Sequence, residues 1–184
     1  MRRRALSRGL APAVLTAALL LPVDVPAAAL PAGRDGAAST EEITRAVTAE
    51  QLEGHLRAFQ GAADAHGGNR AAGTAGYRAS VDHVVERLRA AGYHPRVQAF
   101  TFPYDEDHDD ERGEDTSTER RVTYNVLADT AAGDPGSTVL VGAHLDSVPE
   151  SPGLNDNGSG AAGVLAVAEA LAGTDTRNSV RFAW

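Results

Sequence analysis

A histidine and two aspartates stand close together in GAHLDSVPESPGLNDNGSG, residues 142–160. His144 and Asp146 are two residues apart at the end of an apolar run, and Asp156 follows in a turn rich in asparagine and glycine. Imidazole and carboxylate are both good ligands for Zn²⁺. Asp156 has two oxygens and could bridge two metal ions roughly 3.5–4 Å apart, as in paired-metal hydrolases. Asp146 could fix the tautomer of His144. The stretch is therefore either a hydrolytic metal site or a surface histidine beside two loop aspartates.

Other catalytic schemes fit these residues less well. Ser159 lies in N-G-S-G, which lacks the G-x-S-x-G pattern of a nucleophile elbow. The chain has no cysteine, no H-E-x-x-H and no phosphate-binding G-x-x-x-x-G-K. The glycines of residues 158–163 follow an acidic turn, which would repel a dinucleotide pyrophosphate. The remaining histidines are interpreted as solvated side chains; they are His55, His66, His83, His94 and His108.

A strand, a helix and a second strand are expected around the candidate site. Residues 137–144 are continuously apolar from Val139 to Ala143, which is typical of a strand covered on both faces. Residues 160–173 predict a helix that Ser159 can cap, and residues 178–184 predict another strand. Such a βαβ unit implies a sheet that is at least partly parallel, and ligands bind beyond the carboxyl ends of parallel strands.

The region before this unit predicts two helices and two strands. A capping box, T-A-E-Q, begins at Thr48 and precedes apolar residues at helical spacing. Residues 78–93 form an amphipathic pattern that stops at Gly92. Residues 96–102 and 121–128 alternate like strands.

An acidic run occupies residues 104–120, between the two predicted strands. Such a run is typical of a solvated hairpin loop. A calcium site is the alternative, and a calcium-dependent capture protein would use residues 105–119. The carboxylates lack EF-hand spacing, so the loop interpretation is preferred.

The composition indicates one exported globular domain. Hydrophobic residues make up 42% of the chain, enough for a core, and the formal net charge of −8 argues against a nucleic-acid partner. Residues 1–29 combine a basic start, a short apolar run and small residues, which predicts a secretory signal peptide and no membrane association after cleavage. Residues 30–46 are expected to be a linker or loose arm, and residues 47–184 the catalytic domain. The predicted location is extracellular.

Two long stretches resemble a known family. VLVGAHLDSVPESPGLNDNGSGAAGVLAVAEAL, followed by VRFAW, is similar to the two-zinc aminopeptidases that include secreted bacterial leucine aminopeptidases. GNRAAGTAGYRASVDHVVERLRAAGY resembles an N-terminal segment of the same family, so the resemblance runs from about Thr48 to Trp184. It implies a three-layer α/β/α sandwich around a mixed, mostly parallel sheet. Glutamate carboxypeptidases and glutaminyl cyclases look like more distant relatives.

The resemblance also implies roles for individual residues. His144 would be a ligand of one zinc, Asp156 would bridge both zinc ions, and Asp146 would be the catalytic aspartate beside His144. The peptide bond after Asp156 would be cis. The reaction would be hydrolysis of the N-terminal, apolar residue from peptide substrates.

The sequence departs from the family at its end. In the family, the strand resembling VRFAW runs into Gly-Ala-Glu-Glu, which supplies the general base and another zinc ligand, whereas this sequence ends at Trp184. Two of the five implied metal ligands are matched, so we expect a truncated domain that is inactive by itself. A non-catalytic binding module of the same fold and a cyclase or carboxypeptidase variant stay open as alternatives.

Overall fold

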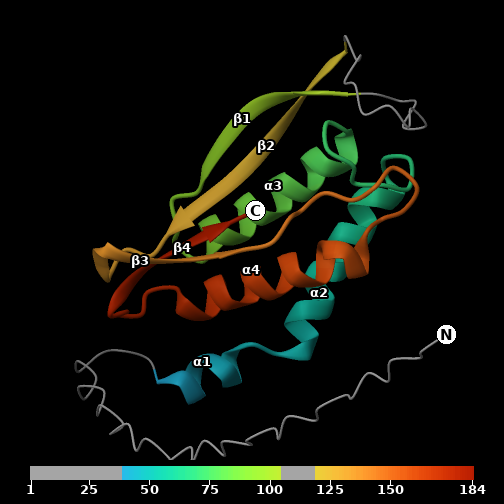
Figure 1. The fold of residues 1–184 in the computed structure, drawn as a ribbon. Coiled ribbons are helices and arrows are strands. Elements are labelled where there is room, and N and C mark those ends of the chain that lie inside the picture. Colours follow the sequence, from blue (N-terminus) through green and yellow to red (C-terminus); the bar gives the residue numbers. More distant parts are fainter. Residues whose placement is uncertain (1–38, 105–118) are drawn as a thin grey trace, which may run out of the picture. The chain divides into compact units, whose positions relative to one another are not determined.

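Helices form the first part of the described chain, and a hairpin and a strand–helix–strand unit follow. The computed structural model describes residues 39–104 and 119–184. In chain order, its elements are α1 (Thr40–Ala46), α2 (Ala49–Asp64), α3 (Ala75–Ala90), β1 (Arg96–Pro103), β2 (Arg120–Asp129), β3 (Asp134–Gly142), an irregular turn over Leu154–Gly158, α4 (Ser159–Leu171) and β4 (Asn178–Ala183) (Figure 1). The predicted signal peptide and most of the predicted acidic loop lie outside the described residues. None of the described helices combines the length and the hydrophobicity that a membrane span requires.

The four described strands form one mixed sheet in the order β1-β2-β4-β3. β1 and β2 are antiparallel, as are β2 and β4, whereas β3 and β4 are parallel. The parallel pair flanks α4, so the predicted βαβ unit and the α/β fold with a mixed sheet are confirmed. Only one of the three pairings is parallel, however, so the described part of the sheet is not mostly parallel.

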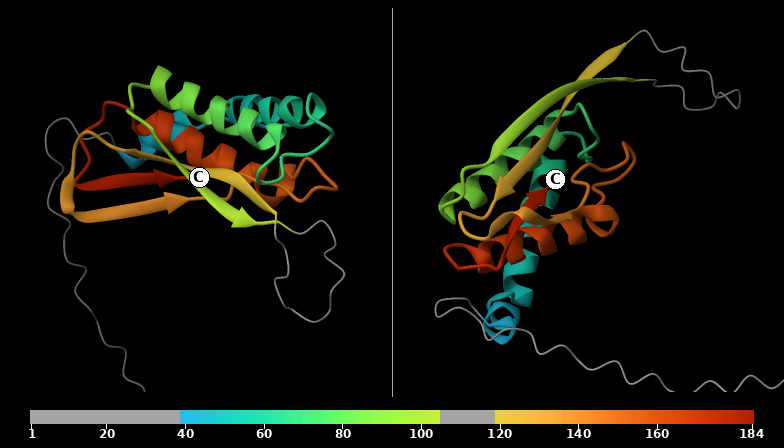
Figure 2. Two further views of the ribbon diagram at one scale, coloured as in Figure 1. Left: turned by 90° about the horizontal axis from the view of Figure 1, so that it is seen from above. Right: turned by 60° about the vertical axis from the view of Figure 1, so that its left-hand side comes forward.

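The helices α2, α3 and α4 lie together on one face of the sheet (Figure 2). The core between the two layers contains fully buried apolar side chains from both of them, including Phe59, Val81, Leu88, Leu165 and Phe182. No helix of the described residues covers the opposite face, so one of the two helical layers implied by the resemblance is present here.

The expectation that residues 137–144 form a strand buried on both faces is wrong. Val139 is 47% exposed and Leu140 is 66% exposed. β3 lies at the edge of the described sheet, where β4 is its only strand neighbour and helices cover one side. The strand also ends at Gly142, so His144 lies just beyond it.

The region expected to be a linker contains a helix. α1 begins after Ser39, whose side chain accepts a hydrogen bond from the Glu42 amide at 3.2 Å, while the Glu42 carboxylate accepts from the Ser39 amide at 2.8 Å. This reciprocal capping box stabilises the first turn. The pattern S-T-E-E at residues 39–42 predicts a helix start. The alanine, glycine and proline content of residues 30–46 led to the linker prediction instead.

Two predicted helix caps need correction. Thr48 caps α2 by accepting from the Gln51 amide at 3.2 Å, but the Gln51 side chain donates to Glu169 instead of reaching back to Thr48. Ser159 does not cap α4; its hydroxyl donates to the Asn155 carbonyl at 3.0 Å. The Asn157 side chain provides the acceptor for an amide in the first turn, that of Gly160, at 3.2 Å.

Candidate metal site at the carboxyl end of β3

The structure brings together all three predicted site residues. Nε2 of His144 lies 2.9 Å from Oδ1 of Asp156, and Nδ1 of His144 lies 3.3 Å from Oδ1 of Asp146. Asp146 and Asp156 thus contact opposite edges of the same imidazole ring. The group lies beyond the carboxyl end of β3, the location that parallel-sheet topology predicts for a ligand.

A sharply turned loop carries Asp156 back to His144. Gly153 has a φ of 60°, and a Cβ at this position would lie 2.5 Å from the Cβ of Ser147, so only glycine fits. The Gly158 amide closes the turn by donating to the Gly153 carbonyl at 2.9 Å. The Asp156–Asn157 peptide bond is cis, as the family resemblance implies.

Both nitrogens of His144 face oxygen acceptors. Nδ1 lies 3.2 Å from the Asp146 main-chain carbonyl, which can only accept a hydrogen bond, so this nitrogen carries a proton. Burial lowers the pKa of His144, but the hydrogen bond to Asp156 and the charge of Asp146 outweigh burial and raise it above its ordinary value. With Nδ1 protonated, the Nε2 lone pair of a neutral ring would face the Asp156 carboxylate, and two electron-pair donors repel each other. A proton or a metal ion between Nε2 and Asp156 removes this repulsion.

This donor set fits a zinc ion. The Nε2 lone pair of neutral His144 would point toward the Asp156 carboxylate, and imidazole with carboxylate is a common zinc ligand pair. The Asp156 side chain is 91% exposed, and its second oxygen has no hydrogen-bond partner among the described residues. Across residues 39–104 and 119–184, no group of three or more His, Cys, Asp or Glu side chains is placed to hold a metal ion.

A buried arginine holds this loop and was missed by the sequence analysis. The side chain of Arg70, from the α2–α3 connection, is fully buried and donates to the carbonyls of Leu145, Pro152 and Gly153. An arginine in a glycine-rich loop carries no local signal of burial, because its partners lie at least 75 residues further along the chain.

The expectation that all other histidines are solvated is wrong for His55. It is 4% exposed in the helical layer, where its Nδ1 lies 3.2 Å from Nε2 of His83 and its Nε2 lies 3.4 Å from the Glu169 carboxylate. His83 is itself only partly exposed. Both histidines lie on inward faces of α2 and α3, where they form a polar contact between helices.

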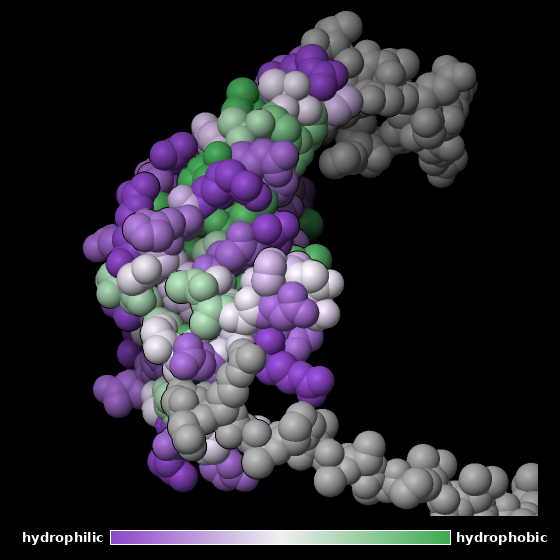
Figure 3. All heavy atoms as spheres, turned by 90° about the vertical axis from the view of Figure 1, so that its left-hand side faces the viewer, coloured by the Kyte–Doolittle hydropathy of each residue, from purple (hydrophilic) through white to green (hydrophobic). Residues whose placement is uncertain are grey.

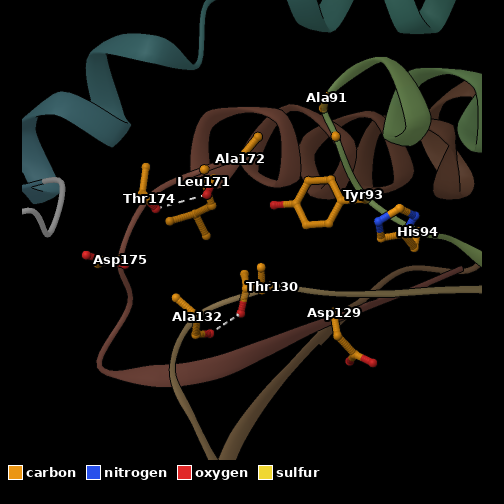
Figure 4. Close-up of a pocket in the computed structure, with 13 residues that line it drawn as sticks. Ala91, Tyr93, His94, Asp129, Thr130, Ala132, Leu171, Ala172, Thr174 and Asp175 are labelled. Atoms are coloured by element: carbon orange, nitrogen blue, oxygen red, sulfur yellow. Dashed lines mark hydrogen bonds between the residues drawn. The ribbon is translucent and has the colours of Figure 1, made fainter.

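A pocket of about 440 Å³ lies at the other end of the sheet from His144. Residues 91–94, 129–132 and 171–175 line it, and these segments precede the starts of β1, β3 and β4 (Figure 4). Its walls include the carboxyl ends of α3 and α4. The candidate metal site is therefore separate from this pocket and lies on an exposed edge.

A family model and several curated proteins match parts of this chain. Residues 125–184 match the model of peptidase family M28. The chain is 40% identical over 135 residues to leupeptin-inactivating enzyme 1 of Streptomyces exfoliatus, which covers 72% of this chain and 27% of that protein. It is 54% identical over 70 residues to an aminopeptidase of Pseudomonas aeruginosa (strain UCBPP-PA14), covering 38% of this chain and 13% of that protein.

The fold also matches solved structures. An aminopeptidase from Aneurinibacillus sp. strain AM-1 superimposes with a TM-score of 0.63 at 14% identity, covering 79% of this chain and 64% of that one. A glutaminyl cyclase of Porphyromonas gingivalis gives a TM-score of 0.60 at 23% identity, covering 76% and 45%. At such identities, the likeness concerns the fold alone.

Fold and site together define an α/β protein with a mixed sheet and candidate metal-binding side chains beyond the carboxyl end of β3. Residues 125–184 match peptidase family M28, and the curated relatives and solved structures agree with that match, which supports the predicted resemblance to zinc aminopeptidases. The chain spans about a quarter of the length of the Streptomyces exfoliatus relative.

Proposed function

We propose that the protein is a secreted zinc aminopeptidase that removes N-terminal residues from peptides. The observation that carries the proposal is the 2.9 Å approach of His144 Nε2 to Asp156 Oδ1 within the segment that matches family M28. Relatives named leucine aminopeptidase and aminopeptidase support the substrate class.

In this proposal, His144 and Asp156 would hold zinc, and the second oxygen of Asp156 would be available as a ligand for a further zinc ion. Bound zinc would polarise the peptide carbonyl and acidify a water molecule. The Asp146 main-chain carbonyl accepts from Nδ1 of His144, and the Asp146 carboxylate lies 3.3 Å from the same nitrogen. These contacts fix the ring orientation and place the lone pair of the neutral ring on Nε2. The proposal would need further metal ligands and a general base beyond these three residues; the match covers 27% of the length of the Streptomyces exfoliatus relative.

The proposal also includes export of the protein from the cell, and it names peptides, but no nucleic acid, as partners. The basic and apolar pattern of residues 1–29 supports secretion, and the net charge of −8 argues against nucleic acid. N-terminal sequencing of protein recovered from the culture medium tests export; a chain starting at Leu30 supports it, and an intact Met1 contradicts it.

The test of the metal site is His144→Ala in the full-length protein. We expect loss of bound zinc and a fall of at least about a hundredfold in hydrolysis of leucine 4-nitroanilide, because a primary ligand is removed. His66→Ala is the matched control, since His66 is exposed and its imidazole contacts the local Ala62 carbonyl at 2.8 Å, away from the candidate site. Retained zinc with near-normal turnover in His144→Ala would contradict the assignment.

A second assay, on peptides, separates the alternative functions. A glutaminyl cyclase would convert an N-terminal glutamine to pyroglutamate without releasing it, and a carboxypeptidase would release residues from the other end. A binding module would bind peptide without product. Mass spectrometry of an N-terminal glutamine peptide and of a leucine peptide distinguishes these outcomes.

A further inference from the structure

Arg70 is buried without an ion-pair partner among the described residues. Its side chain is 0% exposed, and its guanidinium lies over the ring of Phe59 at 5.0 Å from the centroid. A buried charge is costly unless hydrogen bonds compensate for lost water. In Arg70, main-chain carbonyls do this: Nε donates to Pro152 at 2.8 Å, Nη2 donates to Gly153 at 3.0 Å, and Nη1 donates to Leu145.

These carbonyls belong to the two sides of the loop that carries the candidate metal ligands. Leu145 lies between His144 and Asp146, whereas Gly153 begins the turn that leads to Asp156. The guanidinium therefore ties the residue next to His144 to the start of the turn that brings Asp156 back. A planar guanidinium can direct separate N–H groups at separate acceptors, which a lysine ammonium on one atom cannot reproduce.

The main chain of Arg70 reinforces this connection. Its amide donates to the Ser147 hydroxyl at 2.8 Å, and its carbonyl accepts from the Ser147 amide at 3.1 Å. Ala71 and Ser147 form an isolated parallel bridge, so the α2–α3 connection pairs with the loop beside the site. Both the side chain and the backbone of Arg70 therefore contact the same loop.

We propose that Arg70 is a positioning residue that holds residues 145–153 in the conformation in which His144 meets Asp156. The proposal goes beyond the zinc aminopeptidase assignment because it concerns a residue that touches neither candidate ligand. Its consequence for zinc affinity rests on the proposed function, whereas its effect on the loop does not. Burial lowers the pKa of Arg70 and the charge of Asp146 raises it, and an arginine in this setting keeps its charge.

The test uses Arg70→Met and Arg70→Lys in the full-length protein, with Arg57→Met as control. Arg57 is 74% exposed and pairs with Glu53 one helical turn away. Hydrogen exchange in the metal-free protein is measured at the amides of Ser147 and Gly158, and zinc affinity is measured by competition with a chromophoric chelator.

We expect Arg70→Met to increase exchange at both amides at least about tenfold, while amides in α3 and α4 stay protected. Zinc affinity should fall by about 10- to 100-fold, as it does when groups that orient metal ligands are removed. Arg70→Lys should not restore either property, because the charge remains but the separate donors are lost. Arg57→Met should behave like the parent protein.

Unchanged exchange at Ser147 and Gly158 in folded Arg70→Met would overturn the proposal, as would full recovery in Arg70→Lys. Loosening of the loop with parental zinc affinity would also overturn it. If Arg70→Met does not fold, Ser147→Ala carries the test, since it removes the acceptor of the Arg70 amide together with the local hydrogen bond of the same hydroxyl to the Val148 carbonyl. A parental exchange pattern in Ser147→Ala overturns the proposal. A parent protein that binds no zinc refutes the proposed function, and the exchange data still decide the role of Arg70.

Discussion

At the scale of single residues, the helical layer contains an unusual polar group. His55, His83 and Glu169 meet between α2, α3 and α4, and Arg87 donates to Glu169 at 2.7 Å. Burial, followed by the charges of His55 and Arg87, lowers the pKa of His83 to about 4, and burial lowers the pKa of His55. The hydrogen bonds from Arg87 and Gln51 outweigh burial and lower the pKa of Glu169. Neutral histidines beside a charged glutamate are therefore the favoured state.

We expect this histidine pair to make the protein sensitive to acid. An unfolded histidine takes up a proton as the pH falls through about 6.5, whereas folded His83 does so only near pH 4, so protons favour unfolding between these values. The free energy of unfolding should therefore decrease below pH 6.5, by up to about 1.4 kcal/mol per pH unit for one site, until pH 4 is reached. Urea unfolding at several pH values measures this slope.

The matched variant is His83→Gln, which keeps a polar group beside His55 but cannot titrate. Its unfolding free energy should fall less steeply between pH 6.5 and 4 than that of the parent protein. Glu86 and Glu169 act in the opposite direction on His83 and remain in both proteins. Equal slopes in the two proteins would show that His83 is not responsible.

The candidate ligands could be predicted at this scale, but their supporting residues could not. His144, Asp146 and Asp156 fall within thirteen consecutive residues, so local spacing and strand polarity were enough to group them. Arg70 meets Leu145 across 75 positions, and His55 meets His83 across 28 positions. Such contacts depend on how helices and loops pack, which single-sequence periodicity does not specify.

At the scale of elements, two glycines in helices have opposite surroundings. A Cβ added at Gly76, in the first turn of α3, would lie 2.1 Å from the Asn69 carbonyl oxygen, directly before Arg70. A Cβ at Gly61, near the end of α2, would meet nothing within 4 Å. Gly76 is therefore required for close packing of α3 against the preceding loop, whereas Gly61 is not.

Alanine substitutions at these glycines should consequently have effects of opposite sign. Gly61→Ala should stabilise the fold by about 0.5–1 kcal/mol, because alanine loses less backbone entropy in a helix. Gly76→Ala should destabilise it by about 1–3 kcal/mol, because a backbone carbonyl must move. Denaturant unfolding of both variants measures these changes. Destabilisation by Gly61→Ala, or a neutral Gly76→Ala, would contradict this account of the helices.

The existence of most elements was predictable because their patterns are local. Apolar periodicity and the stop signal at Gly92 predicted α3. The structure ends this helix at that point, where Gly92 has a positive φ and the Tyr93 amide donates to the Leu88 carbonyl at 2.9 Å. The apolar run before His144 gave β3, but its burial was predicted wrongly. Exposure of a strand depends on its neighbours in the sheet and on what covers each face, and neither is encoded within the strand itself.

At the scale of the whole described molecule, the sheet carries more apolar surface than its single helical layer covers. Large apolar side chains on the strands are exposed, among them Val97, Phe100, Val122, Val139 and Leu140. Apolar residues reach the surface between hydrophilic ones in the upper half of the view in Figure 3, where the β1–β2 hairpin lies (Figure 1). β3 adds an edge whose outer backbone groups pair with no described strand. Exposed apolar area next to a free edge favours association.

We therefore expect a polypeptide of residues 39–184, produced separately, to self-associate through this surface. Leu140 is the most exposed of the large apolar side chains, at 66%, and it lies on the edge strand. Leu140→Lys should weaken association by about tenfold, because full burial of one leucine contributes about 1.5–3 kcal/mol and part of the Leu140 side chain is buried already. Thr138→Lys adds the same charge two positions away on β3 without removing apolar area, so it should have a smaller effect. Sedimentation velocity over a range of concentrations measures association of the parent polypeptide and of both variants. A monomeric parent polypeptide would contradict the prediction. Equal effects of the two substitutions would show that association does not occur through the exposed apolar face of the sheet.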